Sequence, residues 1–167
     1  QDVHIQQGFA YVNYAAAGIQ VFDVRTPANP IWITGMDGQA DAMALDSDAP
    51  SLTVLNNGSG IIQYDIANPF HLIKRRSFAW TQASKKIAAF RNHIYLLGDN
   101  DELLVVDMSD PDNNIQTRIK AVQYWLDTKR LVTVDPDQHY AIYALGDQDA
   151  GPRLQAQGKF VQGVLSG

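Results

Sequence analysis

Apolar and polar residues alternate along this chain over short stretches, which is the two-residue period of a β-strand with one buried face. Near the N-terminus the alternation predicts strands over 3–6, 9–14, 19–24 and 31–34. These stretches are rich in Val, Ile, Tyr and Phe, and they end at Gly, Pro, Asn or Asp, which favour turns. No window of helical length has an apolar period of about 3.6 residues. The pattern therefore predicts an all-β protein.

The same alternation recurs along the chain with a step of 42 residues. Three segments align without gaps, namely Gly18-Ile-Gln-Val-Phe-Asp-Val24, Gly60-Ile-Ile-Gln-Tyr-Asp-Ile66 and Glu102-Leu-Leu-Val-Val-Asp-Met108. A repeat of this regularity indicates copies of one structural unit. Five columns keep the register: Asp23, Asp65 and Asp107; Pro27, Pro69 and Pro111; Ile19, Ile61 and Leu103; Val12, Val54 and Leu96; Ile31, Ile73 and Ile115.

A fourth unit is recognisable but eroded. Residues 131–135 match the second strand and 140–145 the third, while Ala144 stands where the aspartate is expected and Leu154 lies near the isoleucine column. We expect repeats over approximately 1–39, 40–81, 82–121 and 122–157, within a single region. The tail, 158–167, has the composition of one further strand.

Four short strands in a unit of about 40 residues are typical of a β-propeller blade. The sequence resembles the LVIVD-repeat family, whose units carry a Tyr-Val strand, a Gly-Leu-x-Val-x-Asp-Val strand and a Ser-Asp-Pro-x-x-Pro turn. The matching residues are Ala10-Tyr-Val12, Gly18 to Val24 and Arg25-Thr-Pro-Ala-Asn-Pro30, and Ser109-Asp-Pro111 is closer still to the family's turn. The resemblance implies a β-propeller, or part of one, with about four four-stranded blades. Family members are mostly bacterial and archaeal surface or secreted proteins, and the family implies no single activity.

Four repeats are few for a propeller, which usually has about four to eight blades. Three arrangements are open: a compact four-bladed ring, a larger ring completed by a second chain, and an excerpt of a longer polypeptide. A start at Gln1, without an initiator Met, favours the excerpt.

Charge is distributed unevenly in the 167 residues, which contain no Cys and carry a net charge of −5. Residues 1–73 hold seven acids and one base, 74–91 hold six bases and no acid, and 92–167 hold eleven acids and six bases. The overall acidity argues against nucleic acid as a partner, because phosphate contacts require a broad positive surface. No apolar run approaches the roughly 20 residues of a membrane helix, so we expect no membrane insertion.

The repeated aspartates, Asp23, Asp65 and Asp107, have two interpretations. They could face a central channel as three carboxylates that hold a cation, or each could accept backbone hydrogen bonds in the turn before its proline. One aspartate per unit at the same turn favours the structural role, with Pro27, Pro69 and Pro111 completing the turns. A Ca²⁺ ion is the one cofactor that the sequence suggests, at Asp110-Pro-Asp-Asn-Asn114, although Ala121 replaces the glutamate that closes an EF-hand loop. The four histidines match no zinc spacing, so we expect no other metal.

Residues 74–91, which we call the basic segment, are the most distinctive departure from the repeat. Its cations and tryptophan could dock an acidic protein, a polyanionic glycan or a phosphate. Alternatively, its first three cations protect an outer edge strand from aggregation. The candidate binding residues are Lys74, Arg75, Arg76, Trp80, Lys85 and Lys86.

These patterns favour a non-catalytic scaffold or binding module of a larger secreted or cell-surface protein, extracellular or periplasmic. Its partner would be a protein or glycan, with the rest of the polypeptide or a second chain completing the propeller. The alternative is an enzyme, acting on a glycan or lipid, whose site forms at the central channel. A histidine and carboxylates that converge there, with shifted pKa values, would favour the enzyme.

Overall fold

The chain folds into strands that form four separate sheets. The computed structural model describes residues 2–14, 17–38, 40–56, 60–109, 115–146 and 151–160, with the side chains of 115 and 116 left aside. Every named element in this part of the chain is a β-strand. The strands are β1 (Asp2–Gln6), β2 (Phe9–Asn13), β3 (Ile19–Asp23), β4 (Ile31–Met36), β5 (Ala42–Leu45), β6 (Ser51–Asn56), β7 (Gly60–Asp65), β8 (Ile73–Phe78), β9 (Ser84–Phe90), β10 (His93–Gly98), β11 (Glu102–Asp107), β12 (Ile115–Lys120), β13 (Gln123–Leu126), β14 (Arg130–Val134), β15 (His139–Ala144) and β16 (Arg153–Lys159).

Each sheet is a four-stranded antiparallel meander in which every strand pairs with the next one along the chain. Sheet 1 is β1–β4, sheet 2 is β5–β8, sheet 3 is β9–β12 and sheet 4 is β13–β16. The eroded fourth unit therefore forms a complete sheet, with β13 as a first strand that the sequence pattern did not reveal. β16 extends to Lys159, inside the segment expected to be the tail.

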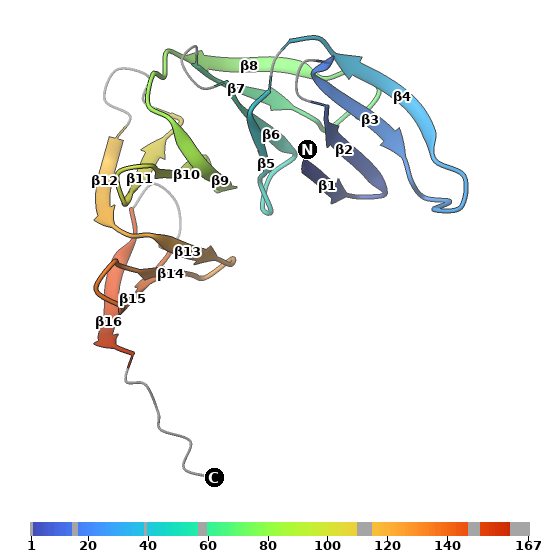
Figure 1. The fold of residues 1–167 in the computed structure, drawn as a ribbon. Helices are drawn as coiled ribbons and strands as arrows, with labels where there is room; N and C mark the ends of the chain where they lie inside the picture. Colours follow the sequence, from blue (N-terminus) through green and yellow to red (C-terminus); the bar gives the residue numbers. More distant parts are fainter. Residues whose placement is uncertain are drawn as a thin grey trace.

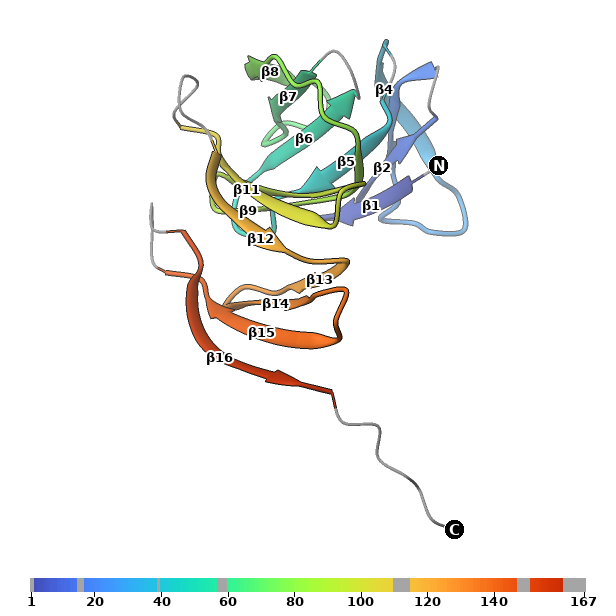
Figure 2. The ribbon, with the colours of Figure 1, turned by 60° about the vertical axis from the view of Figure 1, so that its left-hand side comes forward.

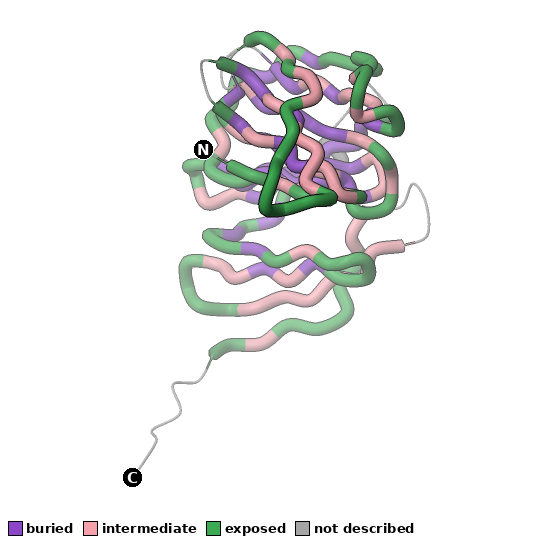
Figure 3. Tube along the Cα trace, turned by 90° about the vertical axis from the view of Figure 1, so that its right-hand side faces the viewer, coloured by how far each residue is buried: buried purple, intermediate pink, exposed green. Residues whose placement is uncertain are grey.

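The four sheets follow one another along an arc that does not close (Figures 1 and 2). β1 packs beside β5, and β5 beside β9, so the first strands lie on the inner side of the arc. The fourth strands, β4, β8, β12 and β16, lie on its outer side (Figure 1). β8 and β16 are accordingly mostly exposed, whereas β6, β10 and β11, in the middle of sheets 2 and 3, are mostly buried. Figure 3 shows that the sheet next to the C-terminus has less burial than the rest of the molecule.

Three apolar cores hold the sheets together, one at each junction. The column of Ile19, Ile61 and Leu103 supplies one side chain to each core, and these residues are 2%, 0% and 0% exposed. Each points toward the following sheet. Val54 and Leu96, in the Val12 column, point toward the preceding sheet and enter the same cores. The repeat therefore exists because each sheet must fit two neighbours, one on each face.

A β-bulge recurs at equivalent places in the pairing of each third strand with its fourth. The register shifts at Val21/Phe22, Gln63/Tyr64, Val105/Val106 and Ile142/Tyr143. The first three places are 42 residues apart. A bulge places one extra residue on one strand and changes the face on which the following side chains lie. The outer strands consequently present their side chains in an order that simple alternation does not predict.

Glycines precede or begin the third strands of sheets 1 and 2 because the backbone of the fourth strand comes too close there for a Cβ atom. A Cβ on Gly18 would lie 1.9 Å from the Met36 carbonyl oxygen, and one on Gly60 would lie 2.4 Å from that of Phe78. The two glycines and the two carbonyl residues are equivalent in the repeat. Both glycines also have positive φ, which other residues adopt only with strain.

Candidate functional site

The repeated aspartates lie in identical turns. A carboxylate oxygen in each accepts a hydrogen bond from the backbone N–H two residues on: Arg25 to Asp23 at 3.0 Å, Ala67 to Asp65 at 2.8 Å and Ser109 to Asp107 at 2.7 Å. The prolines lie in a second turn, which follows each aspartate turn along the chain. The Asn29 N–H donates to Thr26 and the His71 N–H to Asn68, so Pro27 and Pro69 each occupy the second position of a hydrogen-bonded turn. Pro111 lies outside the described residues.

Arginines neutralise two of these aspartates. The Arg25 side chain donates to Asp23 and, together with the backbone bond, lowers the pKa of that carboxyl to about 2. The Arg75 guanidinium likewise holds the pKa of Asp65 below its ordinary value. These carboxylates are thus charged and engaged within their own sheets.

The basic segment is divided among separate places. Lys74, Arg75 and Arg76 lie on β8, an edge strand of sheet 2. Because of the bulge, Lys74 pairs with Tyr64 and Arg76 with Gln63, which puts the two side chains on opposite faces. Arg76 donates to the Met108 carbonyl of sheet 3, whereas Lys74 faces sheet 1.

The remaining residues of the basic segment have other roles. Lys85 pairs with Asp99 at 3.5 Å. Lys86 donates to the Tyr124 carbonyl at 2.7 Å and lies over the Tyr124 ring, and its burial lowers the pKa of its ammonium. Trp80 is 5% exposed and belongs to the core between sheets 2 and 3. These six residues therefore do not gather on one surface.

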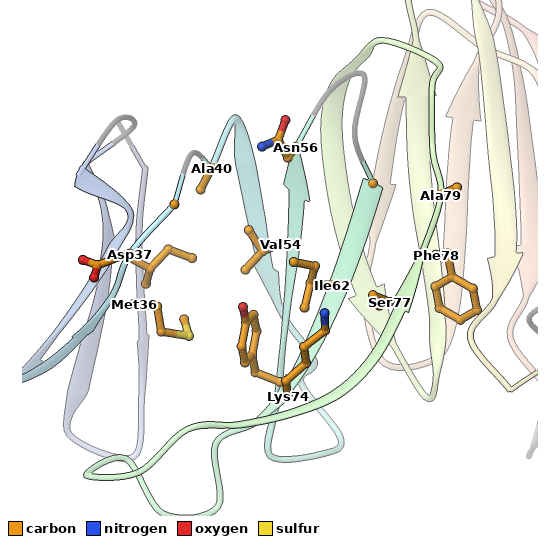
Figure 4. A pocket seen from close by; sticks show the side chains of 14 residues that line it. Met36, Asp37, Ala40, Val54, Asn56, Ile62, Lys74, Ser77, Phe78 and Ala79 are labelled. Carbon is orange, nitrogen blue, oxygen red and sulfur yellow. The ribbon is translucent and has the colours of Figure 1, made fainter.

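A cavity of about 470 Å³ lies between sheets 1 and 2, and we call it the groove. Sheets that radiate from a common centre diverge outward, so space opens between their outer strands (Figure 1). Figure 4 shows Met36 on the sheet 1 wall, opposite Val54 and Ile62, with the Lys74 ammonium directed toward Ile62. The Tyr64 hydroxyl is protonated at neutral pH, and burial raises its pKa above the ordinary value. The sequence pointed to Lys74 as part of a basic run, but it gave no sign of the apolar walls, which come from two different repeats.

The sheets at the ends of the arc expose apolar faces. In sheet 1, side chains that point away from sheet 2 form the first end face, which consists of Val3, Ile5, Val12, Phe22 and Trp32. In sheet 4, side chains that point away from sheet 3 form the second end face, which consists of Trp125, Val132, Tyr140 and Ile142. These exposed faces are the largest departure from the burial seen at the junctions.

One acidic turn brings together a possible set of cation ligands, namely Asp135, Asp137 and His139. Asp135 accepts from the backbone and ring nitrogens of His139, at 2.8 and 3.2 Å, and Lys120 pairs with Asp137 at 3.2 Å. The segment from Asp110 to Asn114, which suggested Ca²⁺, lies outside the described residues. The turn is thus satisfied by its own side chains and by a lysine.

Two buried polar residues near the inner strands, Asp46 and His93, are hydrogen-bonded to backbone groups. Asp46, which is 1% exposed, accepts from the N–H groups of Asp48 at 2.9 Å and Asn92 at 3.3 Å. His93 is buried, and its ring pairs with the Arg91 carbonyl at 3.0 Å. Burial, with a smaller contribution from the Asp46 charge, raises the pKa of Tyr95 well above its usual value. Of these contacts, the hydrogen bond from Asn92 to Asp46 joins sheets 2 and 3.

Four-stranded antiparallel meanders arranged radially, with their first strands innermost, define the blades of a β-propeller. The predicted fold class is therefore confirmed. Within this class, the family model of the LVIVD repeat matches residues 1–37 and 83–115, so these two segments resemble LVIVD repeats, as the motifs predicted. No curated protein sequence is significantly similar to the chain.

Solved propellers resemble the chain in fold at low sequence identity. The N-terminal domain of Nup159 has a TM-score of 0.65 at 9% identity and covers 97% of this chain and 45% of its own. BamB from Moraxella catarrhalis has a TM-score of 0.65 at 7% identity, with coverage of 95% and 47%. KlAtg21, solved with the coiled coil of AgAtg16, has a TM-score of 0.66 at 12% identity, with coverage of 95% and 57%. The chain thus spans about half the length of the solved propellers it matches. Nowhere in the described part of the chain is there a helix with the length and apolar character that a bilayer crossing requires.

Proposed function

We propose that this chain is a non-catalytic propeller scaffold that binds protein, and that its ring is completed by a second copy of the chain. The observation that carries the proposal is the pair of apolar end faces. Large contiguous apolar surfaces on a soluble protein mark interaction sites, because leaving them in water is unfavourable.

The repeat identifies what the first end face is suited to contact. Val3 and Ile5 are 56% and 67% exposed, whereas Ile87 and Ala89, at the equivalent positions of sheet 3, are 9% and 7% exposed against sheet 2. In the inner sheets this face always packs on the preceding sheet. The first end face is therefore complementary to another propeller sheet.

The second end face has the complementary orientation. Tyr140 occupies the position of the column that places Leu103 in the core toward the following sheet. Trp125, 50% exposed, pairs with Val132 on the same face. A second copy that places its sheet 4 on sheet 1 of the first would repeat the junction used within the chain. Two such contacts would close a ring of about eight blades, within the range of known propellers.

A protein partner for the completed ring agrees with the one named for KlAtg21, whose structure contains the coiled coil of AgAtg16. A glycan is the second ligand class that a rigid scaffold with exposed loops accommodates. The LVIVD repeats support a place outside the cytoplasm, at the cell surface, secreted or in the periplasm of a bacterium. The net charge of −5 favours neither nucleic acid nor an anionic membrane.

Analytical ultracentrifugation over a wide concentration range tests the second copy. The chain should dimerise reversibly, and Ile5→Asp or Trp125→Asp alone should weaken dimerisation at least tenfold, since each places a charge in an apolar contact. Ile73→Asp is the matched control, because Ile73 is 50% exposed on β8, away from both end faces. A chain that stays monomeric at all concentrations would overturn completion by a second copy.

Mixing the two variants distinguishes a head-to-tail ring from a dimer that joins two identical end faces. In the head-to-tail ring, Ile5→Asp keeps its second end face and Trp125→Asp keeps its first, so an equimolar mixture should recover one intact contact and dimerise better than either variant alone. If Trp125→Asp dimerises like the unchanged chain, the contact joins two copies of the first end face and the head-to-tail ring is wrong.

A further inference from the structure

We infer that the groove between sheets 1 and 2 binds a small amphipathic monoanion, a fatty-acid-like carboxylate whose tail lies on the apolar walls and whose head group meets Lys74. The inference is independent of ring completion, because every residue that lines the groove lies within one chain.

The walls define the tail. Val54 is 7% exposed, Met36, Ile62 and Tyr64 are partly buried, and together they surround the space from both sheets. The cavity of about 470 Å³ falls within the roughly 300–1,000 Å³ of typical small-molecule sites. A lining dominated by aliphatic and aromatic carbon favours a hydrocarbon body of modest length.

A single cation defines the head group. Lys74 and Asp37 are the charged residues among those lining the groove. Figure 4 shows the Lys74 ammonium directed along the wall toward Ile62, while the Asp37 carboxylate points away from the cavity. Within the described residues, Lys74 has no hydrogen bond or ion pair, in contrast to Arg75 and Arg76 of the same strand. One positive charge at the edge of an apolar space complements one negative charge on an apolar molecule.

The repeat shows that this lysine is not needed to build the sheet. Trp32 is the equivalent residue of sheet 1, and it pairs with Phe22 as Lys74 pairs with Tyr64. The position therefore accepts an aromatic side chain that would cover its cross-strand neighbour. In sheet 2 it carries an ammonium group, which leaves the neighbouring space open and charged.

Calorimetric titration with decanoate, kept below its micelle concentration, tests the site. The chain should bind one decanoate, and Lys74→Met should weaken binding roughly ten- to a hundredfold, since the methionine keeps the stem and removes the charge-assisted bond. Decanol, which has the same tail and no charge, should bind the chain and Lys74→Met equally. Lys129→Met is the matched control, because it removes an exposed cation on sheet 4 and should leave decanoate binding unchanged.

Two outcomes would overturn the inference: no decanoate binding by the unchanged chain, or equal binding by the chain and Lys74→Met. Ile62→Trp provides a second route, because it fills the groove and retains the lysine, and it should abolish binding of decanoate and decanol alike. Circular dichroism and thermal melting of each variant verify folding. Decanoate binding that survives in a folded Ile62→Trp would place the ligand elsewhere and equally overturn the inference.

Discussion

Two isoleucines of sheet 2, Ile61 and Ile73, belong to different repeat columns, and truncating each to alanine tests which column is buried in the core. Ile61 is 0% exposed in the core between sheets 2 and 3, whereas Ile73 is 50% exposed on β8. Ile61→Ala should lower the free energy of unfolding by about 2–5 kcal/mol, through lost transfer energy and a residual cavity. Ile73→Ala removes the same atoms from a half-exposed site, so at about 0.8 kcal/mol per fully buried carbon group the loss should be about 1 kcal/mol.

Urea unfolding followed by tryptophan emission measures both losses. Trp80 is buried in the same core as Ile61, whereas Trp32 and Trp125 are 57% and 50% exposed. Most of the change in tryptophan emission on unfolding should therefore come from Trp80. Far-ultraviolet circular dichroism should give the same midpoint if the sheets unfold together. The account is refuted if Ile73→Ala costs as much as Ile61→Ala, since the column on β8 would then be buried in solution.

Two further predictions concern the turns and the close backbone contacts. The Arg25 contact lowers the pKa of Asp23 from 3.8 to about 2, so the stability that Asp23 contributes should be present above about pH 4 and lost as the pH falls toward 2. Asp23→Asn should therefore flatten this part of the acid-unfolding curve. An unchanged curve would mean that the Arg25 contact contributes nothing in solution. Gly18→Ala should lower the melting temperature more than Gly38→Ala. Both glycines have positive φ, so either alanine costs about 1–3 kcal/mol of backbone strain, but only at Gly18 does the new Cβ meet the Met36 carbonyl. Equal losses of stability in thermal melting would contradict that close contact.

Much of the fold could be predicted because the repeat encodes the contacts between sheets. Ile19, Ile61 and Leu103 recur because each must enter the core toward the following sheet. The equally regular column containing Ile31 and Ile73 is apolar yet at least half exposed. Periodicity reports which residues share a strand position, and it does not report how far that strand lies from the centre of the arc. The columns therefore predicted the architecture better than they predicted burial.

The candidate site could be predicted only in part because it depends on two features that lie outside local sequence. The recurrent bulge reverses the order of faces on the outer strand, so Lys74 and Arg76, which alternation would place together, face different sheets. The groove also needs Met36 from one repeat and Val54 and Ile62 from the next. A basic run in the sequence therefore indicated one charged surface, whereas the fold separates its members.

The comparison of equivalent positions suggests how this propeller separates structure from binding. Residues that repeat unchanged, such as the turn aspartates, are bonded within their own sheets, so they are committed to geometry. The position shared by Trp32 and Lys74 keeps its backbone register and its cross-strand aromatic neighbour while its chemistry changes from an aromatic ring to a cation. A constant frame with a variable side chain at this position lets one repeat offer different chemistry on different sheets. Binding in such a chain is therefore best sought where repeated positions carry unlike residues.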